Sequence, residues 1–447
     1  MKMLASDKTI AVVGLGITGL SSARYLTRKG ASFCVMDSRE NPPGLVELKA
    51  LNPDVRLHVG GFRQDWLADA DEIWLSPGIA LDHPEILRWK GQKLIRGDVD
   101  VFAEEARAPI VAITGSNGKS TVTTLVGEMA AAAGVKVKVG GNLGTAVLDL
   151  LSDEAELYVV ELSSFQLETT RQLNASAATI LNLSQDHMDR YPDMLAYHRA
   201  KIRIFFGCRQ AIMNKQDALA QGPLAEGVKV TWFTSDKPGH NEYGLLADGE
   251  QIWLAKGNQK LLDTAELKIK GAHNWLNALA ALALAEAVSI PLAASQSALK
   301  AFKGLTHRCE WVAEKSGVTY FNDSKATNVG AALAALHGFS KAFSGRLFLI
   351  AGGQGKNQDF RTLHKAINQQ VSGCILMGID AEQIATGLVP AVRIARVATM
   401  DEAVTAAAAM AQPGDVVLLS PACASLDMFQ DYQARGEAFR QAVEALC

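Results

Sequence analysis

The chain has 447 residues, more than one hydrophobic core supports, so about three domains with clefts between them are expected. Its 48% hydrophobic residues, 20% charged residues and formal net charge of -3 are those of an ordinary globular protein. These values exclude a disordered chain and a strongly basic nucleic-acid-binding protein, but they place no limit on small anionic ligands held in local sites.

The six cysteines favour a reducing compartment, because they form neither a CxxC pair nor the dense spacing of a disulfide scaffold. The N-terminal stretch MKMLASDKTIAVVGLG has only a short apolar run that leads into a glycine turn, which indicates a first strand rather than a signal peptide. No apolar run approaches the roughly 18 residues of a membrane-spanning helix. We therefore expect a cytoplasmic protein without a membrane anchor.

Short β-like runs alternate with amphipathic helical stretches over the first hundred residues, a pattern typical of a parallel βαβ sheet. A break near Arg96 to Asp98 precedes a second strand-loop-helix unit at PIVAITGSNGKSTV, which continues through VKVKVGGN, AELYVVELSS and ATILNLS. The turn-rich stretch 215–260 predicts a small antiparallel addition, and NWLNALAALALAEAV predicts a largely buried helix.

A third α/β segment begins near Leu305, with strands expected at VTYFNDS, GRLFLIAGG, GCILMG and DVVLLSPA. The fold class predicted from these patterns is α/β with three domains: residues 1–97, residues 98–304 and residues 305–447.

The sequence TGSNGKST lies between an apolar strand and a helix, where backbone amides of a glycine loop can wrap phosphate. Lys119 would reach the β- and γ-phosphates, and the Ser120 hydroxyl would ligate Mg²⁺. Ile113 stands where the strict phosphate-loop pattern has its first glycine. A plain strand-to-helix turn is the alternative interpretation. The phosphate-binding residues predicted here are Gly115, Ser116, Asn117, Gly118, Lys119, Ser120 and Thr121.

The N-terminal motif GLGITG resembles a dinucleotide fingerprint, and Asp37 ends the next strand, where an acidic residue can hold a ribose. Three interpretations remain open for it: NAD(P) binding, binding of another nucleotide-linked substrate, and a purely structural turn. Ser38, Arg39 and the Ser76-Pro77-Gly78 turn follow strand ends and would suit an anionic UDP group at the same edge.

Polar residues also follow the strands of the central segment. Glu161 ends LYVVE, Asp186 and His187 follow TILNLS, and Asn142 lies in the turn after VKVKV. Carboxylate and imidazole groups beside a triphosphate can ligate Mg²⁺, whereas a helix cap, a loop histidine or a turn asparagine are the structural alternatives. Spacing alone does not select Lys201, because a lone lysine on a helix usually lies on a solvated face.

In the third segment, three loops rich in glycine, lysine and hydroxyl groups follow strands: DSKATN, GGQGK and SPACAS. Such groups gathered at strand ends suit a small anion, either an amino-acid carboxylate or a phosphate.

Taken together, TGSNGKST, ELSSFQLE, DHMDRY, GAHNWLNALAA, THR, NDSKATN, GG-x-GK and SPACASLD resemble the Mur ligase family, in order along essentially the whole chain. The motif TGSNGKST alone would also fit the related folylpolyglutamate synthetases. The glycine-rich N-terminal domain, SPACASLDMF and the lack of an Asp-Asn-Pro-Arg motif indicate the branch that adds D-glutamate.

The resemblance implies an ATP-dependent ligase that joins D-glutamate to UDP-N-acetylmuramoyl-L-alanine through an acyl phosphate during peptidoglycan precursor synthesis. It further implies a Rossmann-like N-terminal domain, a central ATPase-type domain around the phosphate loop and a Rossmann-like C-terminal domain. The partners it implies are these small molecules. The composition and the lack of a membrane-spanning run predict no nucleic acid and no membrane as partners, and the lack of an exposed apolar stripe favours a monomer. The UDP contacts it implies are Ile17, Thr18, Asp37, Ser38, Arg39 and Gly78. The ATP contacts it implies, besides the phosphate loop, are Asn277, Arg308 and Asp323.

By the same resemblance, Asn142 and His187 would line the muramoyl-alanine. Ser120 and Glu161 would hold one Mg²⁺, and His187 and a carbamylated Lys201 a second, so Lys119, Glu161, His187 and Lys201 are the catalytic residues it implies. The residues implied around D-glutamate are Lys325, Thr327, Lys356, Ser425, Leu426 and Tyr432.

Two positions depart from the family pattern: Tyr432 replaces phenylalanine, and Gln354 replaces aspartate in GG-x-GK. Two other classes of function remain as rivals. A nicotinamide-dependent oxidoreductase would explain GLGITG but not TGSNGKST, and a nucleotide-switch module would explain the phosphate loop alone.

Overall fold

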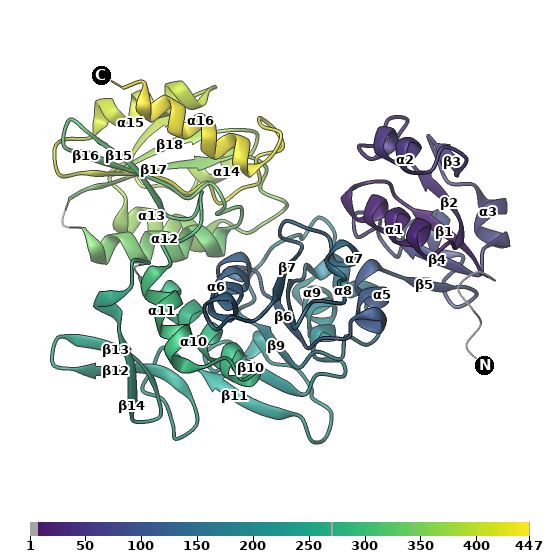
Figure 1. Cartoon of the computed structure of the whole chain (residues 1–447). Coiled ribbons are helices and arrows are strands. Elements are labelled where there is room, and N and C mark those ends of the chain that lie inside the picture. The colour runs from purple at the N-terminus through teal and green to yellow at the C-terminus, as the bar shows by residue number, and fades with distance from the viewer. Residues whose placement is uncertain (1–7, 270, 344, 447) are drawn as a thin grey trace. The chain divides into compact units, whose positions relative to one another are not determined.

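The computed structural model describes residues 8–269, 271–343 and 345–446, and it contains three β-sheets with five, nine and six strands. Each sheet is accompanied by helices, and the chain completes one sheet before it enters the next (Figure 1). By its contacts the described chain forms two compact units. The first runs to Asn182 and includes Leu195–Leu262 and Asn277–Lys300, and the second contains Leu183–Met194, Asp263–Leu276 and the chain from Ala301 onward.

The first sheet is parallel, in the order β3-β2-β1-β4-β5. Successive side chains of β1 point to opposite faces of the sheet, so Ala11 and Val13 lie on one face, in a core cluster with Met36, Ile73 and Leu75. The elements of this region are β1 Thr9–Val13, α1 Ile17–Arg28, β2 Ser32–Asp37, α2 Leu45–Leu51, β3 Arg56–Val59, α3 Gln64–Asp69, β4 Glu72–Leu75, α4 Pro84–Leu87 and β5 Leu94–Arg96.

The central sheet has the order β14-β13-β12-β11-β10-β9-β6-β8-β7. Its strand β6 is buried throughout, as expected for a strand with neighbours on both sides. The strands are β6 Ile110–Thr114, β7 Val137–Gly141, β8 Leu157–Glu161, β9 Ala177–Ile180, β10 Gln210–Asn214, β11 Lys229–Phe233, β12 Tyr243–Asp248, β13 Gln251–Lys256 and β14 Gln259–Asp263. The helices are α5 Asp98–Glu105, α6 Lys119–Ala132, α7 Val147–Leu150, α8 Ser164–Glu168, α9 Met194–Lys201, α10 Ala272–Ala287 and α11 Leu292–Ala301.

The third sheet has the order β15-β16-β20-β17-β18-β19 and carries a separate core on each face. Leu349 and Leu418 pack in the core that contains α12 and α13, whereas Ile350 and Leu419 pack in the core that contains α15 and α16, as the period of a strand requires. Figure 1 shows these two helix pairs on opposite sides of the sheet.

The strands of this region are β15 Glu310–Lys315, β16 Val318–Asn322, β17 Leu347–Gly352, β18 Gly373–Met377, β19 Arg393–Arg396 and β20 Val416–Leu419. Its helices are α12 Val329–Ala342, α13 Arg361–Gln370, α14 Ala381–Ala385, α15 Met400–Met410 and α16 Tyr432–Glu444.

The predicted α/β class and parallel sheets are confirmed, and α10 is buried from Asn277 to Ala285 as its composition indicates. The antiparallel addition is confined to the later part of the 215–260 stretch, where β12 pairs with β13, because β11 continues the central sheet in parallel with β10. In the third sheet the edge strands β15 and β19 were not among the predicted strands; both are partly exposed and lack a continuous apolar run. Within the described residues, no helix is both long and apolar enough to cross a membrane.

Candidate active site

The first sheet brings three polar turns together at one edge. Strands β2, β1 and β4 are neighbours and parallel, so the turns that follow them meet at their carboxyl ends. These turns and residues after β7 and β8 line a cavity of about 550 Å³. Seven residues implied by the resemblance lie in its wall: Ile17, Thr18, Asp37, Ser38, Arg39, Gly78 and Asn142.

Asp37 is the best-defined charged group of this cavity. Its carboxylate accepts hydrogen bonds from the Leu15 amide at 2.6 Å and from the Arg39 amide and guanidinium at 2.7 to 2.9 Å. Burial would raise the pKa of Asp37, but these hydrogen bonds and the positive charge of Arg39 outweigh it and lower the pKa. The carboxylate therefore fixes the glycine turn after β1 and at the same time orients Arg39 at the cavity wall.

The phosphate loop joins β6 to α6 and is held by residues outside the motif. Asn182 lies just beyond β9. Its Oδ1 accepts a hydrogen bond from the Asn117 backbone amide at 2.9 Å, and its Nδ2 donates one to the Asn117 carbonyl at 3.0 Å. The Ser116 hydroxyl lies 3.2 Å from the Tyr197 hydroxyl. The spacing of residues in the sequence did not single out Asn182 or Tyr197, because only the fold brings the end of β9 and helix α9 to the phosphate loop.

Two residues at the start of α6 define the loop further. The Lys119 ammonium donates to the Gly115 and Ser116 carbonyls at 2.8 and 3.0 Å, so it lies over the loop. Gly118 precedes the helix with φ +83°, and a Cβ atom there would lie 2.4 Å from Oδ1 of Asn277. The loop is thus in direct contact with α10, which carries Asn277.

Glu161 ends β8, the neighbour of β6, and is buried together with Ser120 and Thr121 of α6. Its Oε1 accepts from Nδ2 of Asn142 at 2.8 Å, and its carbonyl accepts from the Asn142 amide at 2.8 Å. The hydroxyl and carboxylate oxygens of Ser120 and Glu161 are the hard donors that Mg²⁺ prefers. Among the residues that the structure describes, no group of three or more His, Cys, Asp or Glu side chains could hold a metal ion by itself.

Lys201 is buried, with 1% of its surface exposed, so the solvated face suggested by its helical position is wrong. Its ammonium donates to Oγ1 of Thr114 at 3.1 Å and to the Gly115 carbonyl at 3.0 Å, and it lies 4.9 Å from the centre of the Tyr197 ring. The side chain folds back from the end of α9 onto the phosphate loop, which the spacing of charges on one helix could not reveal.

The three loops predicted around a small anion follow β16, β20 and β17, which are adjacent strands of the third sheet. The order of the strands therefore brings together loops that lie far apart in the sequence. The loop after β17 is also bonded to the loop after β20, since Gln354 and Ala424 exchange backbone hydrogen bonds at 3.0 and 2.8 Å. Ser425 is buried in this arrangement, and Leu426 is exposed.

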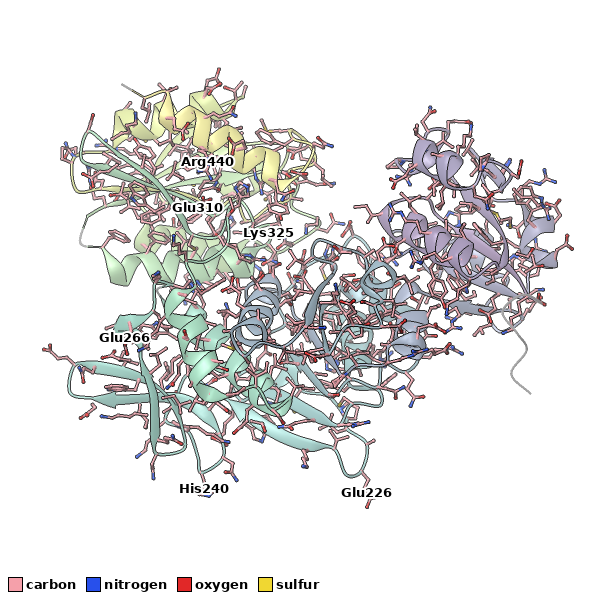
Figure 2. All side chains as sticks on the ribbon, in the orientation of Figure 1. Glu226, His240, Glu266, Glu310, Lys325 and Arg440 are labelled. Carbon is pink, nitrogen blue, oxygen red and sulfur yellow. The ribbon has the colours of Figure 1, made fainter. Side chains whose placement is uncertain are left out.

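Lys325 lies on the loop after β16 (Figure 2), with its ammonium 3.6 Å from the centre of the Tyr432 ring. A cation over an aromatic face is held by the ring quadrupole, so Tyr432 keeps the role that a phenylalanine would have toward this lysine. The amide of Thr327 donates to the Lys325 carbonyl at 2.9 Å, which closes the loop.

Arg435 of α16 joins two of the loops and was not predicted from the sequence. Its guanidinium donates to the carbonyl and hydroxyl of Ser324 at 2.8 and 3.0 Å and to the Cys423 carbonyl at 3.0 Å. Because the side chain is buried, these hydrogen bonds offset part of the desolvation of its charge, which still lowers the pKa of Arg435 to about 10.

Asp323 at the end of β16 accepts from the Ser420 hydroxyl at 2.9 Å and from the Cys309 amide at 3.2 Å. Burial raises the pKa of Asp323 to about 6, although the Ser420 hydrogen bond and the charge of Arg308 oppose the rise. His307 and Cys309, on either side of Arg308, have positive φ angles of 62° and 46°. A tight turn thus presents Arg308 beside Asp323.

His187 and Lys356 lie in the second unit and share one partner, Asp186. The Asp186 carboxylate accepts hydrogen bonds from the Lys356 ammonium at 2.5 Å and from the His187 backbone amide at 3.0 Å. Asp186 was predicted at the edge of the phosphate-loop sheet as a candidate ligand for Mg²⁺. In the structure its carboxylate contacts the loop after β17 through Lys356.

Three family models match the chain: the MurD-like N-terminal domain of Mur ligases over residues 8–95, the Mur ligase middle domain over 113–285, and the glutamate ligase domain over 307–423. Proteins named UDP-N-acetylmuramoylalanine--D-glutamate ligase from Hahella chejuensis and Pseudomonas aeruginosa are 60% and 54% identical over 446 and 447 residues, with 100% of each chain covered.

Two solved structures share the fold over nearly the whole chain. A pseudomurein peptide ligase type C from Methanothermus fervidus has a TM-score of 0.63 at 18% identity, with 98% of this chain and 99% of that chain covered. The UDP-N-acetylmuramate-alanine ligase from Thermotoga maritima has a TM-score of 0.62 at 20% identity, with the same coverage.

Proposed function

The chain belongs to the Mur ligase family, and we propose that it joins D-glutamate to UDP-N-acetylmuramoyl-L-alanine at the expense of ATP, in peptidoglycan precursor synthesis. The observation that carries the proposal is the 60% identity over the whole chain to a curated ligase of that name, and the phosphate loop, whose Lys119 ammonium lies over the loop carbonyls, is consistent with it. ADP, phosphate and an amide are the products.

The reaction needs activation because an amine does not displace hydroxide from a carboxylate at neutral pH. The alanine carboxylate attacks the γ-phosphorus of ATP, the bond to the β-phosphate oxygen breaks, and an acyl phosphate forms. The amine of D-glutamate then attacks the acyl carbon and loses a proton, and phosphate leaves. Lys119 offsets charge on the transferring phosphoryl group, since its ammonium already lies over the loop.

The ATP site comprises the loop from Gly115 to Thr121, with Asn277 at the adenine. Gly118 and Asn277 are in contact, which supports this assignment. Arg308 and Asp323 contact phosphate and ribose, and the hydrogen-bonded Asp323 carboxylate has acceptor capacity suited to a ribose hydroxyl.

Ser120 and Glu161 would hold a first Mg²⁺ beside the triphosphate. The buried oxygen donors of the two residues suit that ion. Bound there, Mg²⁺ neutralises charge on the phosphates. A second ion would be held by His187 and by Lys201 as a carbamate, whose oxygens would supply the hard donors that an ammonium lacks.

The cavity of about 550 Å³ takes the UDP-linked substrate, with Ile17, Thr18 and Ser38 toward the nucleotide and Asn142 toward the muramoyl-alanine. Arg39, oriented by Asp37, and the Gly78 turn complete the UDP contacts. Residues 1–97 thus form the UDP-substrate domain, residues 98–304 the ATP domain and residues 305–447 the amino-acid domain.

D-glutamate is bound by the loops of the third sheet. Lys325 and Lys356 supply positive charge for its carboxylates, and both ammonium groups are held in place by neighbours. The remaining contacts are Thr327, Ser425, Leu426 and Tyr432. The enzyme works as a cytoplasmic monomer on small molecules alone, without nucleic acid or membrane, and its net charge of -3 suits that role.

The test is phosphate release by the purified protein with ATP, Mg²⁺ and UDP-N-acetylmuramoyl-L-alanine, comparing D-glutamate, L-glutamate, meso-diaminopimelate and no amino acid. We expect release with D-glutamate only, and Lys119→Ala should reduce it by at least about 10²-fold. Phosphate release with a different amino acid would show a ligase of the same family with another amino-acid specificity. A folded protein that releases no phosphate under any condition would refute the proposal.

A further inference from the structure

The Asp186 carboxylate is buried, with 8% of its side chain exposed, and lies between two groups assigned to the reaction. Its Oδ1 accepts from Nζ of Lys356 at 2.5 Å and from the His187 amide at 3.0 Å. Its Oδ2 accepts from Nδ2 of Asn328 at 3.3 Å and lies 3.7 Å from Nε2 of His187. One carboxylate therefore contacts a proposed D-glutamate ligand and the backbone of a proposed muramoyl-alanine ligand.

The partners of Asp186 are themselves fixed. Oδ1 of Asn328 accepts from the Ala331 amide at 2.8 Å and so caps α12. The side chain of Gln358 accepts from the Val329 amide at 2.8 Å and donates to the Gly355 carbonyl at 2.7 Å. The loop after β17 and the start of α12 thus form one hydrogen-bonded body against which Asp186 is docked.

His187 and Lys356 both have a left-handed backbone conformation, which residues other than glycine rarely adopt. The φ angles of His187 and Lys356 are 58° and 54°. Such conformations persist only where the surroundings over-determine them, and they gather at functional sites. The Asp186 oxygen that accepts a hydrogen bond from the Lys356 ammonium also accepts one from the His187 amide, so it holds the backbone of His187 and the side-chain end of Lys356 at once.

A buried ion pair is weak evidence for stability, because an apolar pair of the same volume often serves packing equally well. Orientation explains this pair better. An ammonium has three N–H donors, so Lys356 can donate to Asp186 and still donate to a bound carboxylate. Lys356 has only 10% of its side chain exposed, which leaves its ammonium few other directions.

We propose that Asp186 is a positioning residue that aims the Lys356 ammonium at the carboxylate of D-glutamate and ties the His187 backbone to the same body. The proposal rests on the proposed function. Asp186 acts through Lys356 and His187 and does not touch the amino acid itself.

The experiment compares Asp186→Asn with Asp415→Asn in the full-length protein. Asp415 is a matched control, since 7% of its side chain is exposed and it pairs with Arg346 at 2.7 Å in the same sheet. It precedes β20, whereas the site loops follow the strands, so it lies at the opposite edge. Both changes remove one buried charge and keep the side-chain volume.

Both variants should lose thermal stability, but only Asp186→Asn should raise the KM for D-glutamate, by about tenfold, the effect of losing one charge-assisted hydrogen bond. The KM for ATP should stay within about twofold of the wild-type value, a difference of about 0.4 kcal/mol, because the groups that Asp186 holds are assigned to D-glutamate and the muramoyl-alanine. In a Lys356→Gln background, Asp186→Asn should add little to the KM for D-glutamate, because the two residues act as one unit.

An unchanged KM for D-glutamate in folded Asp186→Asn, or an equal rise for all three substrates, would overturn the proposal. So would independent effects of the two changes in the double variant. If Asp186→Asn does not fold, Asp186→Glu keeps the charge and shifts it by one methylene, and it should raise the same KM selectively. If the wild-type protein shows no D-glutamate-dependent release, the proposed function fails and this inference fails with it.

Discussion

Gly118 offers a sharp test of the contact between the phosphate loop and α10. Gly118→Ala would place a side chain at φ +83° and put its Cβ atom 2.4 Å from Oδ1 of Asn277. The left-handed conformation costs roughly 1–2 kcal/mol for a residue with a Cβ atom. Asn277 must also move, and one or two lost hydrogen bonds of about 1 kcal/mol each correspond to a 5- to 30-fold loss of affinity. We therefore expect a higher KM for ATP together with a lower stability.

Gly134→Ala provides the control at the other end of α6. Gly134 has φ +79°, and nothing lies within 4 Å of a Cβ atom added there. It should therefore lose a similar amount of stability while the KM for ATP stays unchanged. Thermal unfolding and initial rates at varied ATP, measured on both variants, separate backbone strain from displacement of Asn277. Equal KM values for ATP in the two variants would refute the contact between Asn277 and the nucleotide.

Three further results are expected. Burial raises the pKa of Asp323 to about 6, so its carboxyl should gain a proton as the pH falls through that value. The KM for ATP should therefore rise below about pH 6, and Asp323→Asn should abolish this inflection in the pH profile. Glu161→Gln should raise the Mg²⁺ concentration for half-maximal rate by at least about 10-fold, since even the loss of a group that only supports a metal ligand has that effect, and an unchanged Mg²⁺ titration would exclude Glu161 as a ligand. Removal of dissolved CO₂ should lower the activity of the wild-type protein, and added bicarbonate should restore it. The residual activity of Lys201→Met should not respond to either change. Equal responses of the two proteins would refute a carbamate on Lys201.

Residues that follow strands were predictable, because an apolar run ending in glycine and polar residues marks the carboxyl edge of a parallel sheet. The turn after β1 and the phosphate loop after β6 follow this rule, and Glu161 closes β8 beside the latter. The strand order explains why the separate turns converge, and neither composition nor periodicity contains that order. The family resemblance supplied the assignment that the local patterns left open.

Residues that reach a site from a helix or from a distant segment were not predictable from local patterns. Lys201 looks like a surface lysine on α9, yet its side chain is buried against Thr114 and Gly115. Arg435 is one of several charged residues on α16, and only the fold brings it to Ser324 and Cys423. These positions depend on tertiary contacts, which a helical period does not encode.

The most direct test of the proposed reaction follows oxygen from the substrate into phosphate. UDP-N-acetylmuramoyl-L-alanine with ¹⁸O in its terminal carboxylate is incubated with the protein, ATP, Mg²⁺ and D-glutamate, and the released phosphate is analysed by mass spectrometry. An acyl phosphate predicts that each phosphate carries one labelled oxygen, the former bridging atom, and that the other label stays in the amide. Unlabelled phosphate would show that water, not the alanine carboxylate, receives the phosphoryl group, and would contradict the ligase mechanism.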